Sequence, residues 1–168
     1  MEIAIALDCY DDIFSDFDIR SYRERALSRD FLDELHIRLR KRGTEGRVEI
    51  VLLVPAGERR QTDERLILER MQGFFEERHA YYARQNRGNR FRSILYIAAG
   101  LALSLVANLI QRRLTSFPLF SDFLLIPAWF FVWNGLELFL KNRKEAAGKE
   151  AYYAALSSAK KAFRDMEE

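Results

Sequence analysis

The sequence predicts an α+β membrane protein: a small cytoplasmic β-α-β head, and a long antiparallel helical stalk continuous with a two-helix transmembrane hairpin. Three observations favour this fold class. Two long apolar runs follow one another closely in the second half of the chain. Two short segments in the first sixty residues have the alternating or β-branched pattern of strands. Apolar residues at helical spacing occupy much of the remaining chain.

The average composition does not show the apolar runs. A mean hydropathy of −0.24 and 31% charged residues are typical of a soluble domain. The segment between Ser93 and Leu140, however, has only four charged residues, which are Arg112, Arg113, Asp122 and Glu137. A net charge of +2, from 27 basic and 25 acidic residues, does not give the strongly basic face of a nucleic-acid-binding protein. We therefore expect the lipid bilayer, and no nucleic acid, as a partner.

Each apolar run is long enough to cross a bilayer. The first, SILYIAAGLALSLVANLIQ, predicts transmembrane helix 1 over residues 93–111. At about 1.5 Å per residue it covers most of the ~30 Å apolar core of a membrane. The second predicts transmembrane helix 2 over residues 119–140, with an external loop over 112–118. Two buried helices that are apolar on all sides would leave too little of a 19.8 kDa chain to cover them in a soluble fold.

Basic residues at the ends of the two runs predict the orientation of the hairpin. Only Arg112 and Arg113 lie in the connecting loop. Because cytoplasmic flanks are enriched in Lys and Arg, both termini are expected in the cytoplasm, and the chain is expected to be a multi-pass protein of the cell (inner) membrane. The residues on the cytoplasmic flanks are Arg78, Arg84, Arg87, Arg90, Arg92, Lys141, Arg143, Lys144 and Lys149.

Residues 1–60 are predicted to form the cytoplasmic head. EIAIALD, residues 2–8, and RVEIVLLVP, residues 47–55, have the patterns of strands. Between them Ser28 is a suitable N-cap for a helix. A strand, a helix and a second strand in this order predict a parallel pair with a right-handed crossover. The apolar residues at helical spacing are Phe31, Leu32, Leu35 and Leu39.

Two long helices are predicted to connect the head with the membrane. A stalk helix is expected over residues 61–92 with Thr62 as its N-cap, and a C-terminal helix over residues 141–168. In the C-terminal helix the spacing of Tyr152, Leu156, Ala159 and Phe163 favours one apolar stripe. The two helices would then pack as an antiparallel pair.

The small size of the predicted sheet favours association with other chain segments or other copies. A two-stranded sheet with one crossover helix is rarely stable alone, so the head is expected to pack on the stalk or on another copy. In the first span, the pairs Ala98–Ala102 and Gly100–Ser104 allow helices to approach closely in lipid. We therefore expect a homo-oligomer.

The segment FDIRSYRERALSRDFLDEL, Phe17–Leu35, carries a resemblance to a known family. Together with the following strand ending in LLVP, the long helix, the two spans and the WNGLE segment, it resembles a family of small uncharacterised prokaryotic two-span membrane proteins. The resemblance covers the layout of nearly the whole chain, although those relatives often carry Pro where this chain has Ile19. It implies a cytoplasmic α/β head on a two-span anchor, and it implies no activity.

Five carboxylates within eleven residues form a candidate metal site. Such oxygen ligands are the ones that Ca²⁺ and Mg²⁺ use. The spacing lacks the order of ligands of an EF-hand loop. Turn and cap formation after a strand, with Arg20, Arg23 and Arg25 as partners, explains these residues equally well. The carboxylates are Asp8, Asp11, Asp12, Asp16 and Asp18.

Polar residues in or beside the spans are candidates for pore lining or ion handling, because ionisable groups inside a membrane are costly. An oligomer would form an acidic ring from Asp122 at the outer end of the second helix. The alternatives are an exposed cap for Asp122 and a pairing near the inner interface for Glu137. The candidates are Asn108, Asp122, Asn134 and Glu137.

Basic residues at the inner face are candidates for binding lipid head groups, although the same residues are needed to orient the hairpin. These residues are Arg84, Arg87, Arg90, Arg92, Lys141, Arg143 and Lys144.

No catalytic or cofactor motif is present in the sequence, which lacks a P-loop, GxGxxG, GxSxG and HExxH. We therefore expect no enzyme activity and no cofactor. The function predicted is that of a membrane-anchored oligomeric scaffold or accessory subunit with a cytoplasmic interaction domain that binds a protein partner. The alternative is a small homo-oligomeric ion channel or a ligand-gated membrane effector.

Overall fold

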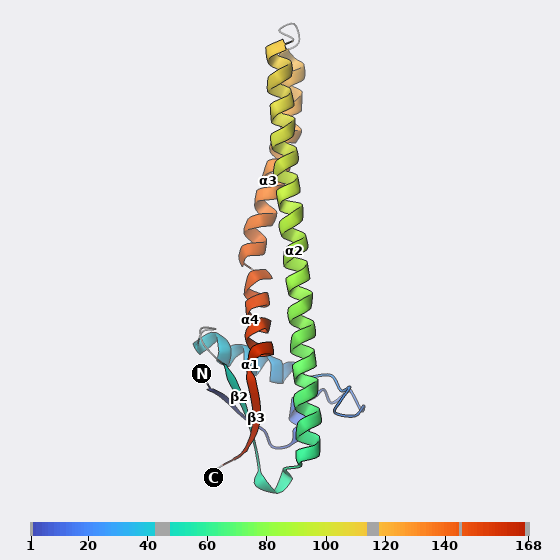
Figure 1. Ribbon diagram of the computed structural model, residues 1–168, viewed down its shortest axis with the longest axis vertical. Coiled ribbons are helices and arrows are strands. Elements are labelled where there is room, and N and C mark those ends of the chain that lie inside the picture. The colour runs from blue at the N-terminus through green and yellow to red at the C-terminus, as the bar shows by residue number, and fades with distance from the viewer. Residues whose placement is uncertain (1, 43–47, 114–117, 145, 167–168) are drawn as a thin grey trace. The chain divides into compact units, whose positions relative to one another are not determined.

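The computed structural model describes residues 2–42, 48–113, 118–144 and 146–166 of the chain (Figure 1). The chain divides into two compact units. The head unit consists of Met1–Ala80 together with Ala151–Glu168, and the hairpin unit consists of Tyr81–Glu150.

The head unit contains a three-stranded parallel sheet. Its strands are β1 (Glu2–Ala6), β2 (Glu49–Val54) and β3 (Lys160–Asp165), in the order β1-β2-β3. Ile3 lies opposite Ile50, and Leu52 lies opposite Phe163. Because side chains alternate along a strand, these apolar residues share one face of the sheet. The two predicted strands are confirmed, and β2 is the central strand.

The third strand corrects the predicted C-terminal helix of residues 141–168. Helix α4 runs over Ala146–Ser158, and the chain then forms β3. The spacing of Leu156, Ala159 and Phe163 fits a helix but does not arise from one. All three are buried in the head core, Leu156 from α4, Phe163 from β3 and Ala159 from the link between them. The segment KKAFRD has little β-branched content, so its strand is stabilised by hydrogen bonding and packing against β2 rather than by intrinsic preference. The third strand supplies the support that a two-stranded sheet lacks.

Helix α1 (Arg29–Arg42) crosses over between β1 and β2. Its predicted cap is confirmed, because the Ser28 hydroxyl oxygen accepts a hydrogen bond from the Phe31 amide at 3.0 Å. Leu35 and Leu39 are buried against the sheet. The short 3-10 helices η1 (Tyr10–Ile13) and η2 (Ala56–Glu58) follow β1 and β2.

Helix α2 (Gln61–Arg113) and helix α3 (Pro118–Lys144) complete the chain. The prediction of Thr62 as N-cap is wrong, because Thr62 already lies inside α2 and the Arg60 carbonyl accepts the Glu64 amide at 3.0 Å. Within the head unit α2 contributes Ile67, Met71 and Phe75 to the core, and each of these residues is fully buried.

The head unit has helices on one face of its sheet. The core joins the apolar side chains of that face with α1, with the first part of α2 and with Leu156 of α4. On the other face Arg164 forms ion pairs with Glu2 at 3.2 Å and with Glu49 at 3.3 Å. One ion-pair group thus spans all three strands, since these residues come from β3, β1 and β2.

A buried carboxylate ties β3 to the beginning of α2. Arg59 binds Glu64 through two hydrogen bonds, of 2.8 and 3.0 Å, and donates a third to Asp165 at the end of β3, at 2.9 Å. The Tyr10 hydroxyl donates to Glu64 at 3.1 Å and accepts from the Arg60 amide at 2.8 Å. The hydrogen bonds from Arg59 hold the pKa of the Glu64 carboxyl below its usual value, against the opposing effect of burial.

We expect Phe163→Ala to destabilise the head by about 3 kcal/mol, because a buried aromatic side chain is removed from the contact between β3 and the core. The matched control is Lys160→Ala in the same strand, where the side chain is exposed and the expected change is below about 0.5 kcal/mol. Hydrogen exchange of the β2 amides in the full-length protein measures both. Equal protection in the two variants would contradict the assignment of residues 160–165 to the sheet.

We expect Arg59→Ala to cost the head roughly 2 kcal/mol, because Glu64 loses its cation while remaining largely buried. Arg60→Ala is the matched control. Arg60 lies 4.0 Å from Asp63 and its side chain is 72% exposed, so its removal should cost less than about 0.5 kcal/mol.

The depressed pKa of Glu64 also predicts an acid sensitivity. The ordinary carboxyl pKa here is 4.5, and the folded value is lower. The stabilisation is therefore present above pH 4.5 and is lost as the pH falls through the folded pKa. Glu64→Gln should reduce this acid-dependent loss in hydrogen-exchange experiments on β2. An unchanged slope would show that Glu64 is not the titrating group.

Candidate functional site

The hairpin unit contains two helical segments that are long and apolar enough to cross a membrane. Only 17% of the apolar window in α2 and 11% of that in the second helical segment is buried. The predicted spans, residues 93–111 and 119–140, fall within α2 and α3. The apolar side chains of these helices therefore lie mostly on the outside of the helix pair.

Glycines bring α2 and α3 into direct contact. A Cβ atom added to Gly100 would lie 2.6 Å from the Val132 side chain and 2.7 Å from the Ala128 carbonyl oxygen. A Cβ atom added to Gly135 would lie 2.6 Å from the Ile97 side chain. Real Cβ atoms are not found so close to other atoms, so a larger residue at either position would push the helices apart.

The buried residues of the helix pair repeat every seven positions. On α2 they are Asn86, Ser93, Gly100 and Ala107, and on α3 they are Ala128 and Gly135. A seven-residue repeat keeps one narrow stripe of each helix on its partner. We call this contact, formed by these six residues, the small-residue seam. The expected pair Ala98–Ala102 is not part of it, because both alanines are exposed.

Two polar side chains are buried in the seam. The Ser93 hydroxyl donates to the Gly135 carbonyl oxygen at 2.6 Å. Asn86 donates from Nδ2 to Glu150 at 2.5 Å, whereas its Oδ1 has no hydrogen-bond partner within the described part of the chain. The Ser93 hydrogen bond therefore fixes the register of the two helices. In this register Ser93 lies opposite Gly135, and Gly100 lies opposite Ala128.

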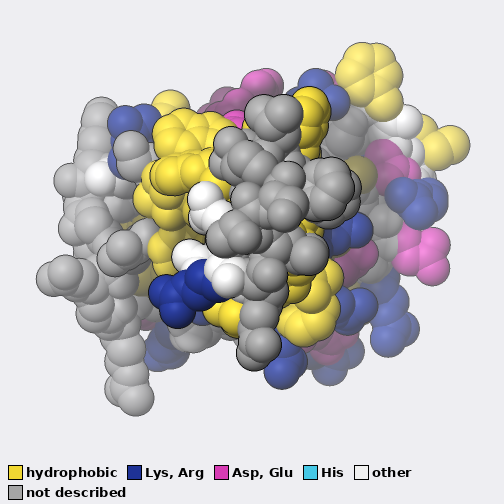
Figure 2. Space-filling model, turned by 90° about the horizontal axis from the view of Figure 1, so that it is seen from above, with side chains coloured by type: hydrophobic (Ala, Val, Ile, Leu, Met, Phe, Trp, Pro, Cys, Tyr) yellow, Lys and Arg dark blue, Asp and Glu magenta, His cyan; other side chains and the backbone are white. Residues whose placement is uncertain are grey.

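Large apolar side chains cover the outside of the helix pair. Viewed along the pair, hydrophobic side chains surround its end (Figure 2). A small-residue interior with a large apolar exterior is the reverse of the usual arrangement in a water-soluble helix pair. Among the described large apolar residues of the hairpin unit, those exposed above 59% are Phe91, Ile94, Leu101, Leu105, Phe123, Ile126, Trp129, Phe130 and Trp133.

The predicted ion-handling residues whose side chains are described, Asn108, Asn134 and Glu137, do not converge within one chain. Asn134 donates to the Phe130 carbonyl oxygen of its own helix at 2.8 Å. Glu137 is exposed and lies two residues beyond Gly135, so it projects from α3 on the side away from α2. The register of the seam places Asn134 roughly a dozen residues, or about 18 Å, along the hairpin from Asn108. The side chain of Asp122 lies outside the described residues.

The predicted lipid-binding residues whose side chains are described lie on the surface of the hairpin unit. Arg84, Arg87, Arg90, Arg92 and Lys141 are all exposed. No carboxylate of the described residues forms an ion pair with any of them. The side chains of Arg143 and Lys144 lie outside the described residues.

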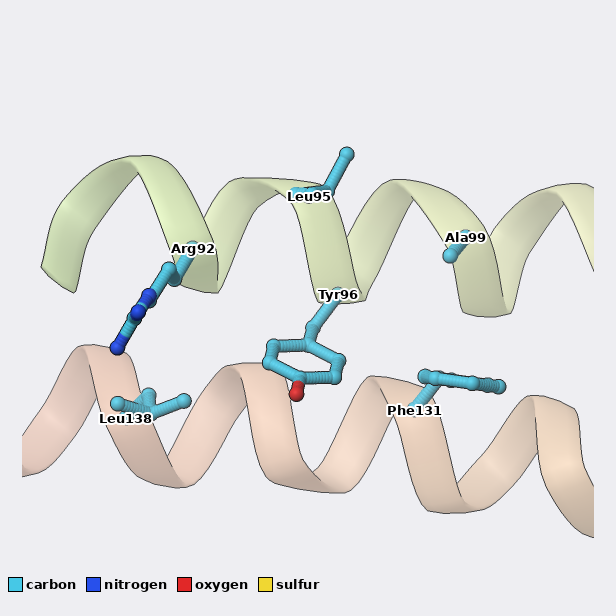
Figure 3. Close-up of a pocket in the computed structure, with 6 residues that line it drawn as sticks. All are labelled: Arg92, Leu95, Tyr96, Ala99, Phe131 and Leu138. Atoms are coloured by element: carbon cyan, nitrogen blue, oxygen red, sulfur yellow. The ribbon is translucent and has the colours of Figure 1, made fainter. Parts of the chain in front are cut away.

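Two grooves lie beside the seam. The first has a volume of about 600 Å³ and is shown in Figure 3; its lining residues are Arg92, Leu95, Tyr96, Ala99, Phe131 and Leu138. The second has a volume of about 320 Å³ and is lined by Tyr82, Gln85, Asn89, Leu138, Lys141, Ala146 and Lys149. Leu138 belongs to both grooves. The helical pattern of the sequence did not indicate them, because grooves depend on the register between the two helices.

Three of the five candidate carboxylates in the head, those of Asp11, Asp12 and Asp18, have structural partners. The Asp12 carboxylate accepts the Asp8 and Cys9 amides at 2.8 and 3.1 Å, and Asp11 binds Arg25 at 2.5 Å. Within the described residues, no three acidic, His or Cys side chains come together as a metal site would require. These contacts correspond to the turn and cap interpretation that the sequence left open, and the carboxylates of Asp8 and Asp16 are exposed.

A loop of the head that is closed by hydrogen bonds presents two fully exposed apolar side chains. The Ser15 amide donates to the Ala26 carbonyl oxygen at 2.9 Å and closes the loop. Asp18 accepts the Ala26 amide at 2.8 Å and binds Arg20, whose guanidinium holds the pKa of that carboxyl well below its usual range. Phe17 is 99% exposed and Ile19 is 97% exposed. The sequence of this segment indicated a resemblance to a family, but it did not indicate that Phe17 and Ile19 form an exposed apolar surface.

Comparison of the chain with family models, with curated proteins and with solved structures found no match. The resemblance of Phe17–Leu35 to a two-span membrane family therefore stays a prediction.

We expect Gly100→Ala to destabilise the helix pair by about 1–3 kcal/mol, because the added methyl group meets the backbone of α3. Gly88→Ala is the matched control. It lies in the same helix with nothing within 4 Å of the added methyl group, so it should stabilise α2 by up to about 1 kcal/mol. Helical circular dichroism during denaturation of the full-length protein in detergent measures both changes. Equal effects would contradict the close contact at Gly100.

Proposed function

We propose that this protein is a membrane-anchored oligomeric scaffold or accessory subunit, in which the hairpin unit anchors the chain and the head unit binds a cytoplasmic partner. The observation that carries the proposal is the distribution of side-chain size in the hairpin. Small residues form the seam, and large apolar residues cover the outside.

This distribution fits a lipid environment better than water. Exposed apolar patches of more than a few hundred Å² are rare on soluble monomers. In lipid such side chains need no cover, and helices associate through close packing of small residues instead. A polar group in the apolar core of a membrane needs a hydrogen-bond partner within the protein. The Ser93 hydroxyl has one, because it donates to a backbone carbonyl oxygen. The basic flanks then orient both termini toward the cytoplasm.

The loop with Phe17 and Ile19 supports an interaction role for the head. Its conformation is held by Asp18, which bonds to both Arg20 and the Ala26 amide. Two fully exposed apolar side chains on a loop that is fixed in this way lose little entropy when they bind a partner. Within the described residues, the parallel sheet has helices on one face only, whereas parallel sheets are usually covered on both faces. These surfaces favour a protein partner or a second copy of the chain.

We propose no catalytic role. Arg59, Glu64 and Tyr10 form a partly buried polar cluster in the described head, and their polar atoms are bonded to one another and to β3. The alternative of an ion channel requires Asn108, Asn134 and Glu137 to share one path between several copies. Cation flux into liposomes, reduced by Glu137→Gln, would favour that alternative.

The proposal predicts that the chain stays in the membrane pellet after alkaline extraction and that its two ends face the cytoplasm. Cys9 is the single cysteine and is exposed, so it reports the side on which the head lies. An impermeant maleimide should label Cys9 in opened cells and not in intact cells. In the matched variant Cys9→Ser with Gln111→Cys, intact cells should be labelled. The opposite pattern, or release into the supernatant, would refute the anchor.

Native mass spectrometry of the purified full-length protein tests the oligomeric part. Two or more copies are expected. Phe17→Ser with Ile19→Ser should reduce binding to the partner or to other copies, whereas Ile37→Ser, which alters an exposed residue of α1, should not. A monomer that crosslinks to no other protein in the native membrane would contradict the scaffold.

A further inference from the structure

The two grooves beside the seam are parts of one longitudinal groove. On α2 the lining residues other than Leu95 follow one another at intervals of three or four, from Tyr82 to Ala99, and so lie on a single face of the helix. The α2 residues on this face are Tyr82, Gln85, Asn89, Arg92, Tyr96 and Ala99. Leu138 of α3 lines both parts and joins them.

One end of this groove is apolar. Tyr96 stacks on Phe131 with ring centroids 5.9 Å apart and an interplanar angle of 27°. Figure 3 shows both rings between α2 and α3, with Ala99 of α2 level with the Phe131 ring. Because Ala99 is small, the groove stays open there, and it offers roughly 10 Å of apolar channel between Ala99 and Arg92.

The other end of the groove is cationic. The lining of the groove changes from apolar to cationic at Arg92. In Figure 3 the Arg92 guanidinium reaches toward α3 near Leu138. Lys141 lies one helical turn beyond Leu138 and lines the second part together with Gln85. Lys149 also lines this part, with its ammonium 5.8 Å from the Tyr82 ring. No described carboxylate forms an ion pair with Arg92, Lys141 or Lys149.

We propose that this groove binds one anionic phospholipid per chain, with an acyl chain against Tyr96, Ala99 and Phe131 and with the phosphate between Arg92 and Lys141. The proposal deepens the proposed function, since it rests on the hairpin being in a bilayer. It goes further by naming a specific site rather than general attraction of the basic flanks to the membrane.

The order of chemistry along the groove supports this occupant. A phospholipid has an apolar chain, then a phosphate, then a polar head, and the groove offers aromatic rings, then two cations, then amide groups and a lysine. A free phosphate would use only the cationic end. An apolar helix of a second copy would leave Arg92 and Lys141 unpaired in the contact, which is costly.

The test uses the full-length protein in detergent, titrated with phosphatidylglycerol and followed by native mass spectrometry. We expect one tightly bound phosphatidylglycerol per chain, and weaker binding of phosphatidylcholine. Arg92→Gln with Lys141→Gln should weaken phosphatidylglycerol binding about thirtyfold, at roughly fivefold for each charge removed.

Two matched controls separate the groove from general electrostatics and from misfolding. Arg87→Gln with Arg90→Gln removes the same charge from other faces of α2 and should change binding less than about threefold. Ala99→Leu fills the apolar end without changing charge and should weaken binding at least about tenfold, whereas Ala98→Leu, at an exposed position that lines neither groove, should not. Circular dichroism confirms that each variant is helical.

Four outcomes would overturn the proposal. These are equal binding of phosphatidylcholine, non-saturating binding of many lipids, equal weakening by the two double charge variants, and displacement of the lipid by inorganic phosphate at millimolar concentration. A dimer that Ala99→Leu abolishes in the absence of lipid would show instead that a second copy occupies the groove. Failure of the membrane anchor itself is seen separately, as release of the chain during alkaline extraction.

Discussion

The parallel pairing of β2 with β3 is the constraint on which the rest of the structure depends. Two parallel strands cannot be joined by a tight turn, so the chain must return from the end of β2 to the beginning of β3 through a crossover. Here the crossover contains all of α2, α3 and α4. The sheet therefore fastens both ends of the hairpin: β3 pairs with the central strand, and Arg59 joins Asp165 at the end of β3 to Glu64 near the start of α2.

The two units use opposite ways of packing. In the head unit large side chains such as Phe75, Leu156 and Phe163 form an interior, which water drives together. In the hairpin unit the contact is made by Ser93, Gly100 and Gly135, and the large side chains point outward. Dispersion between closely approaching backbones then holds the pair, and such contacts tolerate no added methyl group.

Much of this architecture can be predicted from the sequence. The apolar runs, the strands of residues 2–6 and 49–54 and the Ser28 cap are local signals, and each is found. What was missed depends on partners that are distant in sequence. The segment KKAFRD follows a helix, and apolar residues at helical spacing continue into it. Its strand conformation depends on its pairing with β2, which is distant in sequence. The seam and the groove depend on the register of two helices, which neither helix specifies alone.

Because β3 follows the hairpin in the chain, the head can complete its sheet only after the hairpin has been synthesised. Until both apolar segments have been made, β2 has β1 on one side and an open edge on the other, and such edges pair readily with other chains. Contacts between residues that are far apart in sequence also form slowly. A chain in which β3 has not yet paired with β2 therefore keeps its sheet incomplete and its Phe163 side chain unburied.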